Sequence, residues 1–168
     1  MADSGTADSA IVIELADEAA TEALAARVAA TAHPGDVIAL EGALGAGKTV
    51  FARAFIRARA SQGGAKVDEV PSPTFTLMQA YELAGGTVYH FDLFRLASVE
   101  EAYELGIEEA FADGISLIEW PDRLGGFLPR RSLRVSLAQG PTQGSRIVRL
   151  EAGGGEQRRW RAGVASVG

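Results

Sequence analysis

A glycine-rich stretch directly behind an apolar run is the part of this sequence best suited to chemistry. Residues 41–49 read EGALGAGKT and follow the run VIAL, and Gly42 through Thr49 match the phosphate-loop spacing G-x-x-x-x-G-K-[ST]. Glycines let backbone N–H groups approach phosphate oxygens, a lysine adds a compact positive charge, and a threonine hydroxyl can bind Mg²⁺. The stretch therefore predicts a nucleotide phosphate site with a metal ion, placed between a strand and a helix.

Two acidic residues end apolar runs further along the chain. VYHFD ends in Asp92 and ISLIE ends in Glu119. In an open α/β sheet, ligands bind at the carboxyl ends of strands, and a phosphate loop needs an acid on the metal side. Each acid alone could equally be an exposed residue at a strand end. Two of them in a chain with a phosphate loop favour the functional interpretation.

The stretch PSPTF, residues 71–75, is the third candidate. It follows the long loop 61–73, and its hydroxyls on Ser72 and Thr74 resemble those of a switch segment that senses a γ-phosphate and its metal. Clusters of Pro, Ser and Thr are also common in ordinary loops, so this motif does not decide by itself.

Strands and helices must position these residues, and the hydrophobic patterning predicts where they lie. We expect strands over residues 10–15, 35–42, 74–83, 87–94, 115–120, 132–140 and 145–153. We expect helices over 18–32, capped by Asp17, over 48–60, over 98–106 with a Ser98/Glu101 capping box, and over 107–114. Strands joined by turns beside strand–helix alternation predict an α/β fold: a P-loop NTPase-like three-layer sandwich with a mixed, partly antiparallel central sheet.

Length and composition indicate one domain. The 168 residues are 47% hydrophobic and contain no cysteine, which excludes disulfides, thiol nucleophiles and zinc–thiolate sites. The two histidines, His33 and His90, argue against a histidine-rich metal site. We expect a disordered tail over 1–9, one domain over 10–152 and a polar, arginine-rich tail over 153–168. The start has no signal-peptide pattern and no run is long enough for a membrane span, so we expect a cytoplasmic location and no membrane partner.

Charge is unevenly spread along the chain. The net charge is −6, but residues 129–168 hold eight arginines and two acids. This basic segment is either a solvated face or a docking surface for an acidic partner or RNA. The chain has no Asn-Lys-x-Asp stretch for guanine recognition and no arginine-rich lid typical of a small nucleoside kinase. These absences favour a nucleotide switch or assisting ATPase.

Five stretches in this order resemble the bacterial TsaE (YjeE) family: GALGAGKT, SPTFTL, YHFDLFRL, EEAYELGIEEAF and LIEWPDRLGGFLP. The resemblance covers roughly residues 11–129, and an ordered set of motifs is highly specific. It implies a small P-loop ATPase for threonylcarbamoyl modification of tRNA adenosine at position 37. It also implies that the protein acts with the TsaB–TsaD pair, and that its ATP hydrolysis supports repeated rounds of tRNA modification. Contact with tRNA is then expected only through that complex.

The resemblance also implies roles for individual residues. ATP or ADP phosphates are expected on Gly42, Leu44, Gly45, Ala46, Gly47, Lys48 and Thr49, with contributions from Thr74 and Asp92. Mg²⁺ is expected on Thr49 and Glu119, and Lys48, Asp92 and Glu119 are the expected catalytic residues. Either acid could orient the attacking water. Arg146 is a further candidate for a contact near the nucleotide, or else a surface arginine.

One departure lies at the centre of the loop. Ala43 stands where the family usually has aspartate, and Phe94 replaces a usual tyrosine. Position 43 does not cradle phosphate, so we expect binding to survive. Turnover is expected to be weak, unless Glu41 substitutes for the missing acid. A small-molecule kinase and a non-hydrolysing, nucleotide-gated binding module remain the alternatives.

Overall fold

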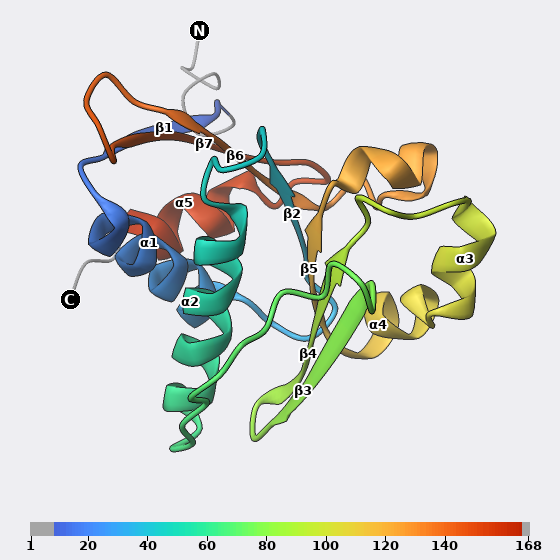
Figure 1. The fold of residues 1–168 in the computed structure, drawn as a ribbon. Helices are drawn as coiled ribbons and strands as arrows, with labels where there is room; N and C mark the ends of the chain where they lie inside the picture. Colours follow the sequence, from blue (N-terminus) through green and yellow to red (C-terminus); the bar gives the residue numbers. More distant parts are fainter. Residues whose placement is uncertain (1–8, 166–168) are drawn as a thin grey trace, which may run out of the picture.

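Strands of the described chain form a single sheet in the order β1-β7-β6-β2-β5-β4-β3 (Figure 1). The computed structural model describes residues 9–165. The strands are β1 Ile11–Leu15, β2 Val37–Glu41, β3 Met78–Leu83, β4 Gly86–Asp92, β5 Ile115–Glu119, β6 Leu133–Gln139 and β7 Arg146–Ala152. The helices are α1 Glu18–Thr31, α2 Lys48–Gln62, α3 Val99–Glu104, α4 Ile107–Asp113, the 3₁₀ turn η1 Pro121–Phe127 and α5 Gln157–Ala165.

The sheet is mixed, as the sequence predicts. β2 runs parallel to β5 and β6, and β4 runs parallel to β5. The β3–β4, β6–β7 and β1–β7 pairs are antiparallel. Parallel strands in the centre need crossover helices, so this pattern produces an α/β fold whose helices lie on both faces of the sheet (Figure 1).

Each face of the sheet covers its own hydrophobic core. One core packs strand residues such as Leu40, Val88 and Leu117 against α1, α2 and α5, and the other packs Phe91 and Ile118 against α3, α4 and η1. Side chains alternate between the faces of a strand. Since Val88 and Leu117 face α2, the side chains two residues further along each strand share that face.

The first helix is capped as the sequence predicts, whereas the third begins after Ser98 as predicted but lacks the predicted capping bonds. Asp17 accepts a hydrogen bond from the Ala20 N–H at 2.9 Å and caps α1. The Ser98 side chain makes no capping bond at α3 among the described residues. Instead, the carboxylate of Glu101 reaches back one residue further and accepts from the N–H of Ala97 at 3.0 Å. The predicted capping box is therefore wrong.

The predicted arginine-rich tail is also wrong for most of its length. α5 packs against α1, and its Trp160 and Val164 side chains are buried in the core on that side of the sheet. Only three positions of α5, spaced by three and four residues, are buried, and the residues between them are mostly polar. This sparse pattern did not predict a helix. The domain therefore extends past Ala152. Of the predicted N-terminal tail, residues 1–8 lie outside the described residues.

None of the helices within residues 9–165 combines the length and apolar character needed to cross a membrane.

Candidate functional site

The glycine-rich loop lies between β2 and α2, as predicted. Gly45 and Gly47 have positive φ angles of 79° and 108°, which place them in the region that favours glycine. Gly42 has φ 145°, and a Cβ added there would lie 2.5 Å from the carbonyl oxygen of Leu137 on β6. Among the described residues, no side chain caps α2 at Gly47. The first turn of α2 therefore offers its N–H groups and its dipole to an anion.

Lys48 folds back over this loop. Its Nζ donates to the carbonyl oxygens of Gly42 and, at 3.1 Å, Ala43. The same ammonium lies 4.0 Å from the ring centroid of Trp120, and the side chain is only 5% exposed. The lysine is thus already positioned inside the loop by backbone and aromatic contacts.

Burial lowers the pKa of Lys48 below its ordinary value, and three carboxylates oppose that shift. They are Glu119, Asp92 and Asp122, in order of decreasing effect. A cation that burial destabilises gains from an anionic ligand, because the ligand supplies charge that the protein contacts provide only in part.

Glu119 is buried at the end of β5 with both carboxylate oxygens bonded. Oε1 accepts from the Thr49 hydroxyl at 3.0 Å, and Oε2 lies 2.7 Å from Nε2 of His90. Glu119 is 3% exposed and His90 is fully buried. The two predicted metal residues, Thr49 and Glu119, are therefore in direct contact.

Asp92, at the end of β4, receives the PSPTF segment. Its Oδ2 accepts from the Thr74 hydroxyl and its Oδ1 from the Phe94 N–H, both at 3.1 Å. Ser72 and Thr74 hydroxyls lie 2.8 Å apart. Residues 74–77 form a turn, so the predicted strand over 74–83 is shorter at its start than expected. This turn is what brings Thr74 to Asp92.

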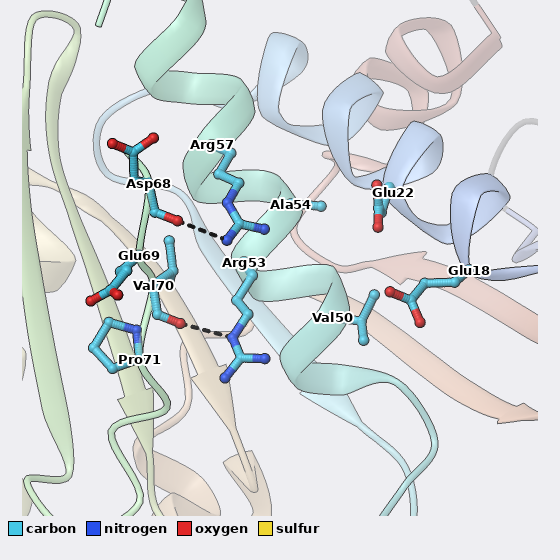
Figure 2. A pocket seen from close by; sticks show the side chains of 10 residues that line it. All are labelled: Glu18, Glu22, Val50, Arg53, Ala54, Arg57, Asp68, Glu69, Val70 and Pro71. Atoms are coloured by element: carbon cyan, nitrogen blue, oxygen red, sulfur yellow. Dashed lines mark hydrogen bonds between the residues drawn. The ribbon is translucent and has the colours of Figure 1, made fainter. Parts of the chain in front are cut away.

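The loop before this segment is attached to α2 through backbone carbonyls (Figure 2). Arg53 Nε donates to the carbonyl of Val70 at 2.8 Å, and Arg57 Nη2 donates to that of Asp68 at 3.2 Å. Glu18 of α1 lies across a pocket of about 560 Å³ between α1, α2 and this loop (Figure 2). The arginines thus position the chain that leads to Thr74.

A cleft of about 380 Å³ brings most of the predicted residues together. Its lining includes Leu44, Gly45, Gly47, Lys48, Thr49, Ser72, Thr74, Asp92, Glu119, Trp120 and Arg146. Gly42 and Ala46 do not line it: Ala46 is buried behind the loop, and Gly42 supports the loop against β6. The lining combines a loop able to bind phosphate, a hydroxyl and two carboxylates able to hold a metal ion or a water.

Arg146 lies at the loop and not on a remote surface. From the start of β7, its Nε donates to the carbonyl of Ala46 at 2.9 Å and its Nη2 to that of Gly45 at 3.3 Å. Glu41, in contrast, is bound to β6, where its oxygens accept from Arg134 and Ser136 at 3.0 and 3.1 Å. These contacts engage both carboxylate oxygens of Glu41 at the adjacent strand. Its role as a substitute acid stays a prediction.

Three interactions at the site were not anticipated from the sequence. They are the bond of His90 to Glu119, the contact of Trp120 with Lys48, and the electrostatic effect of Asp122 on Lys48. His90 could have been found, because it precedes Asp92 by two residues and so shares its face of β4. Trp120 also has a positive φ of 60°, an uncommon conformation for a bulky residue that is often found at functional sites.

The fold and this site define a P-loop-like α/β protein, in which a glycine loop leaves a central parallel strand and leads into a helix. The family model described as "Threonylcarbamoyl adenosine biosynthesis protein TsaE" matches residues 15–148. The chain belongs to the TsaE family.

Individual relatives agree with this assignment. A protein of Rickettsia bellii named tRNA threonylcarbamoyladenosine biosynthesis protein TsaE is 41% identical over 73% of this chain and 83% of its own length. The protein of that name from Bacillus subtilis is 39% identical over 68% of this chain and 69% of its own length. The crystal structure of Bacillus subtilis YdiB superposes with a TM-score of 0.75, covering 94% of this chain and 95% of that one at 28% identity.

Proposed function

We propose that this chain is the ATP-binding and ATP-hydrolysing component of the machinery that makes threonylcarbamoyladenosine in tRNA. The family assignment supports the pathway, which the relatives' names give as tRNA threonylcarbamoyladenosine biosynthesis. The observation that carries the nucleotide part is the convergence of the loop, Thr49–Glu119 and Thr74–Asp92 in one cleft.

Charge at the start of α2 favours ATP phosphates on the loop. We assign them to the glycine loop from Gly42 to Gly47, to Lys48 and to Thr49. The N-terminus of α2 has no side-chain cap among the described residues, and the buried Lys48 has only partial compensation for its charge. Both features favour an anion at this point of the cleft.

A magnesium ion fits the oxygen donors beside the phosphates. Mg²⁺ prefers oxygen ligands, often keeps several waters, and is commonly held by one or two protein groups together with phosphates. Thr49 and Glu119 supply such donors, and the described residues contain no cluster of three or more His, Cys, Asp or Glu side chains that would make a protein-only cage. A bound Mg²⁺ neutralises charge that develops on the phosphates during transfer.

Asp92 and Glu119 are the candidates for orienting the attacking water. Asp92 holds Thr74 of the PSPTF segment, so a nucleotide that displaces this bond would also move the segment. That coupling gives the ATP site a way to signal to a partner. We further propose that the partners are TsaB and TsaD, that tRNA is reached only through them, and that the chain acts in the cytoplasm where tRNA is modified.

Reconstitution of tRNA modification from purified partners tests this function. With limiting TsaB–TsaD, ATP and this chain should together support many rounds of modification. Full multiple turnover in its absence would contradict the proposal. ATP binding without any effect on modification would retain the nucleotide site and reject the pathway role.

A nucleotide-gated binding module with negligible hydrolysis is the second candidate. Ala43, in place of the family's usual aspartate, and the engagement of Glu41 by β6 favour it. ATP-dependent capture of TsaB–TsaD, with phosphate release at background, would distinguish this module from an ATPase.

A further inference from the structure

His90 is a fully buried polar side chain that the proposed reaction does not yet use. It lies on β4, on the face that packs against α2, and its register partner on the parallel strand β5 is Leu117. Glu119, two residues beyond Leu117, therefore shares that face. Strand register thus brings an imidazole and a carboxylate together under the metal side of the cleft.

The hydrogen bond between these two side chains indicates which ring nitrogen of His90 carries a hydrogen. Glu119 Oε2 is a carboxylate oxygen that accepts, so the Nε2 of His90, 2.7 Å away, carries the donated hydrogen. The Nδ1 of His90 has no hydrogen-bond partner among residues 9–165. The bond from Nε2 to Glu119 is therefore the polar contact that orients the imidazole ring of His90.

Glu119 needs this second contact to be fixed. The terminal torsion of a glutamate side chain is broad, so one hydrogen bond leaves the plane of the carboxylate able to rotate. Thr49 holds Oε1 from the loop side, and His90 holds Oε2 from inside the sheet. The two bonds together define which oxygen faces the hydroxyl that would bind Mg²⁺.

We propose that His90 is a positioning residue: it orients Glu119 for Mg²⁺ and thereby sets the affinity of the nucleotide site for the metal. The inference rests on the proposed Mg²⁺–ATP site. It assigns His90 no contact with nucleotide or metal, so ATP binding in the absence of metal should not depend on it.

Two substitutions distinguish the hydrogen bond that His90 donates to Glu119 from the volume that its ring fills. His90→Leu fills the volume but removes the donor, whereas His90→Gln places an amide N–H on a longer side chain that can reach Glu119. His90→Asn is a further variant, polar but too short to reach. Unfolding temperatures establish which variants fold, and if the Leu variant does not, the Asn–Gln comparison replaces it.

Intrinsic fluorescence provides a readout other than turnover. The ring centroid of Trp120 lies 4.0 Å from Nζ of Lys48 in the cleft, so its fluorescence should respond to a bound nucleotide. The only other tryptophan of the sequence, Trp160, is buried in the core on the side of α1. ATP is titrated with a chelator present, and Mg²⁺ is then titrated at saturating ATP. Loss of a hydrogen-bonding partner of a metal ligand typically weakens metal affinity by about 10- to 100-fold. We expect an increase of that order in the Mg²⁺ requirement of His90→Leu, unchanged metal-free ATP binding, and recovery of most of the loss in His90→Gln.

The outcomes are distinguishable. An unchanged Mg²⁺ requirement in a folded Leu or Asn variant overturns the positioning role. A parallel loss of metal-free ATP binding, or no recovery in the Gln variant, indicates a merely structural role and also overturns it. Failure of the unmodified chain to bind ATP at all rejects the proposed function instead.

Discussion

Lys48 lies among backbone carbonyls and an indole ring, and these are contacts that a phosphate can replace or supplement. Its Nζ bonds to Gly42 and Ala43 hold the ammonium over the loop, and burial lowers its pKa against the attraction of nearby carboxylates. The free energy gained when an anion arrives is therefore larger than for a solvated lysine.

Lys48→Ala should abolish this gain. Because a hydrogen bond to a charged group contributes about 1.5–3 kcal/mol, we expect ATP affinity to fall by roughly 10- to 100-fold or more. Titration calorimetry measures it directly. Lys66→Ala is the matched control, since Lys66 is the only other lysine and its side chain is 87% exposed. Equal affinities for the two variants would place the phosphates elsewhere.

Ala43 is the position at which a substitution is expected to increase the rate of ATP hydrolysis instead of lowering it. Ala43→Asp supplies a carboxylate to a loop whose nearest alternative, Glu41, is bound by Arg134 and Ser136. If the family's aspartate positions water or metal, hydrolysis should rise by roughly tenfold or more, below the 10²–10⁴ range of full general-base catalysis. Phosphate release at saturating Mg²⁺–ATP measures the rate. An unchanged rate, with ATP still bound, would show that position 43 does not limit turnover.

Helix α2 connects the glycine loop to the PSPTF segment that carries Thr74. It begins at Lys48, and one turn after Thr49, on the same face, Arg53 projects from it. Arg53 bonds to the carbonyl of Val70 (Figure 2). A displacement of the first turn of α2 would therefore be transmitted to the segment that carries Thr74.

Arg53→Met tests this attachment, because methionine keeps much of the apolar stem and deletes the donors. We expect faster hydrogen exchange over residues 68–77 and a lower rate of ATP hydrolysis, with the unfolding temperature little changed. Arg57→Met is the matched control: its bond to the carbonyl of Asp68 is longer, at 3.2 Å, and more exposed, so its effect should be smaller. Identical exchange in the Arg53 variant and the unmodified chain would contradict the coupling.

Local sequence predicts most elements but not their cross-chain contacts. The strand–loop–helix around Gly42–Thr49 and the strand ends at Asp92 and Glu119 follow from short apolar runs and glycine spacing. The same patterns place His90 on the face of Asp92, but its bond to Glu119 could not be predicted from them, since it requires the β4–β5 register, which long-range pairing determines. The turn at Thr74 was missed because its side-chain bond to Asp92 lies eighteen positions away.

At the scale of the whole molecule, residues 129–165 of the basic C-terminal segment form β6, β7 and α5 and are part of the domain. Arg146 bonds to the glycine loop, and Arg159 makes bonds of 2.8 and 3.0 Å to the carboxylate of Asp36. The other arginines of residues 129–165 with intramolecular bonds are Arg131, Arg134, Arg149 and Arg161. Much of the positive charge of this segment therefore has a structural use, and its role in docking an acidic partner or RNA stays a prediction.

Helix α5, the last element of this segment, contributes its largest buried side chain to the core. Trp160 is 1% exposed in the core shared with α1 and α2, although its helix is rich in arginine. The hydrophobic area of one large ring compensates for the polar composition of the other positions. That is why counting charged residues predicted a tail where the structure has a helix.

Trp160→Ala should therefore destabilise the domain as a core substitution does, by about 3–5 kcal/mol in the free energy of unfolding. The loss includes the transfer free energy of the ring and the cavity left between α5 and α1, because the surrounding helices relax only in part. Urea unfolding followed by circular dichroism measures it. Arg158→Ala, an exposed neighbour on the same helix, is the control and should change stability by no more than about 0.5 kcal/mol. If both variants unfold at the same urea concentration, α5 is dispensable for the core, and the domain ends with β7 after all.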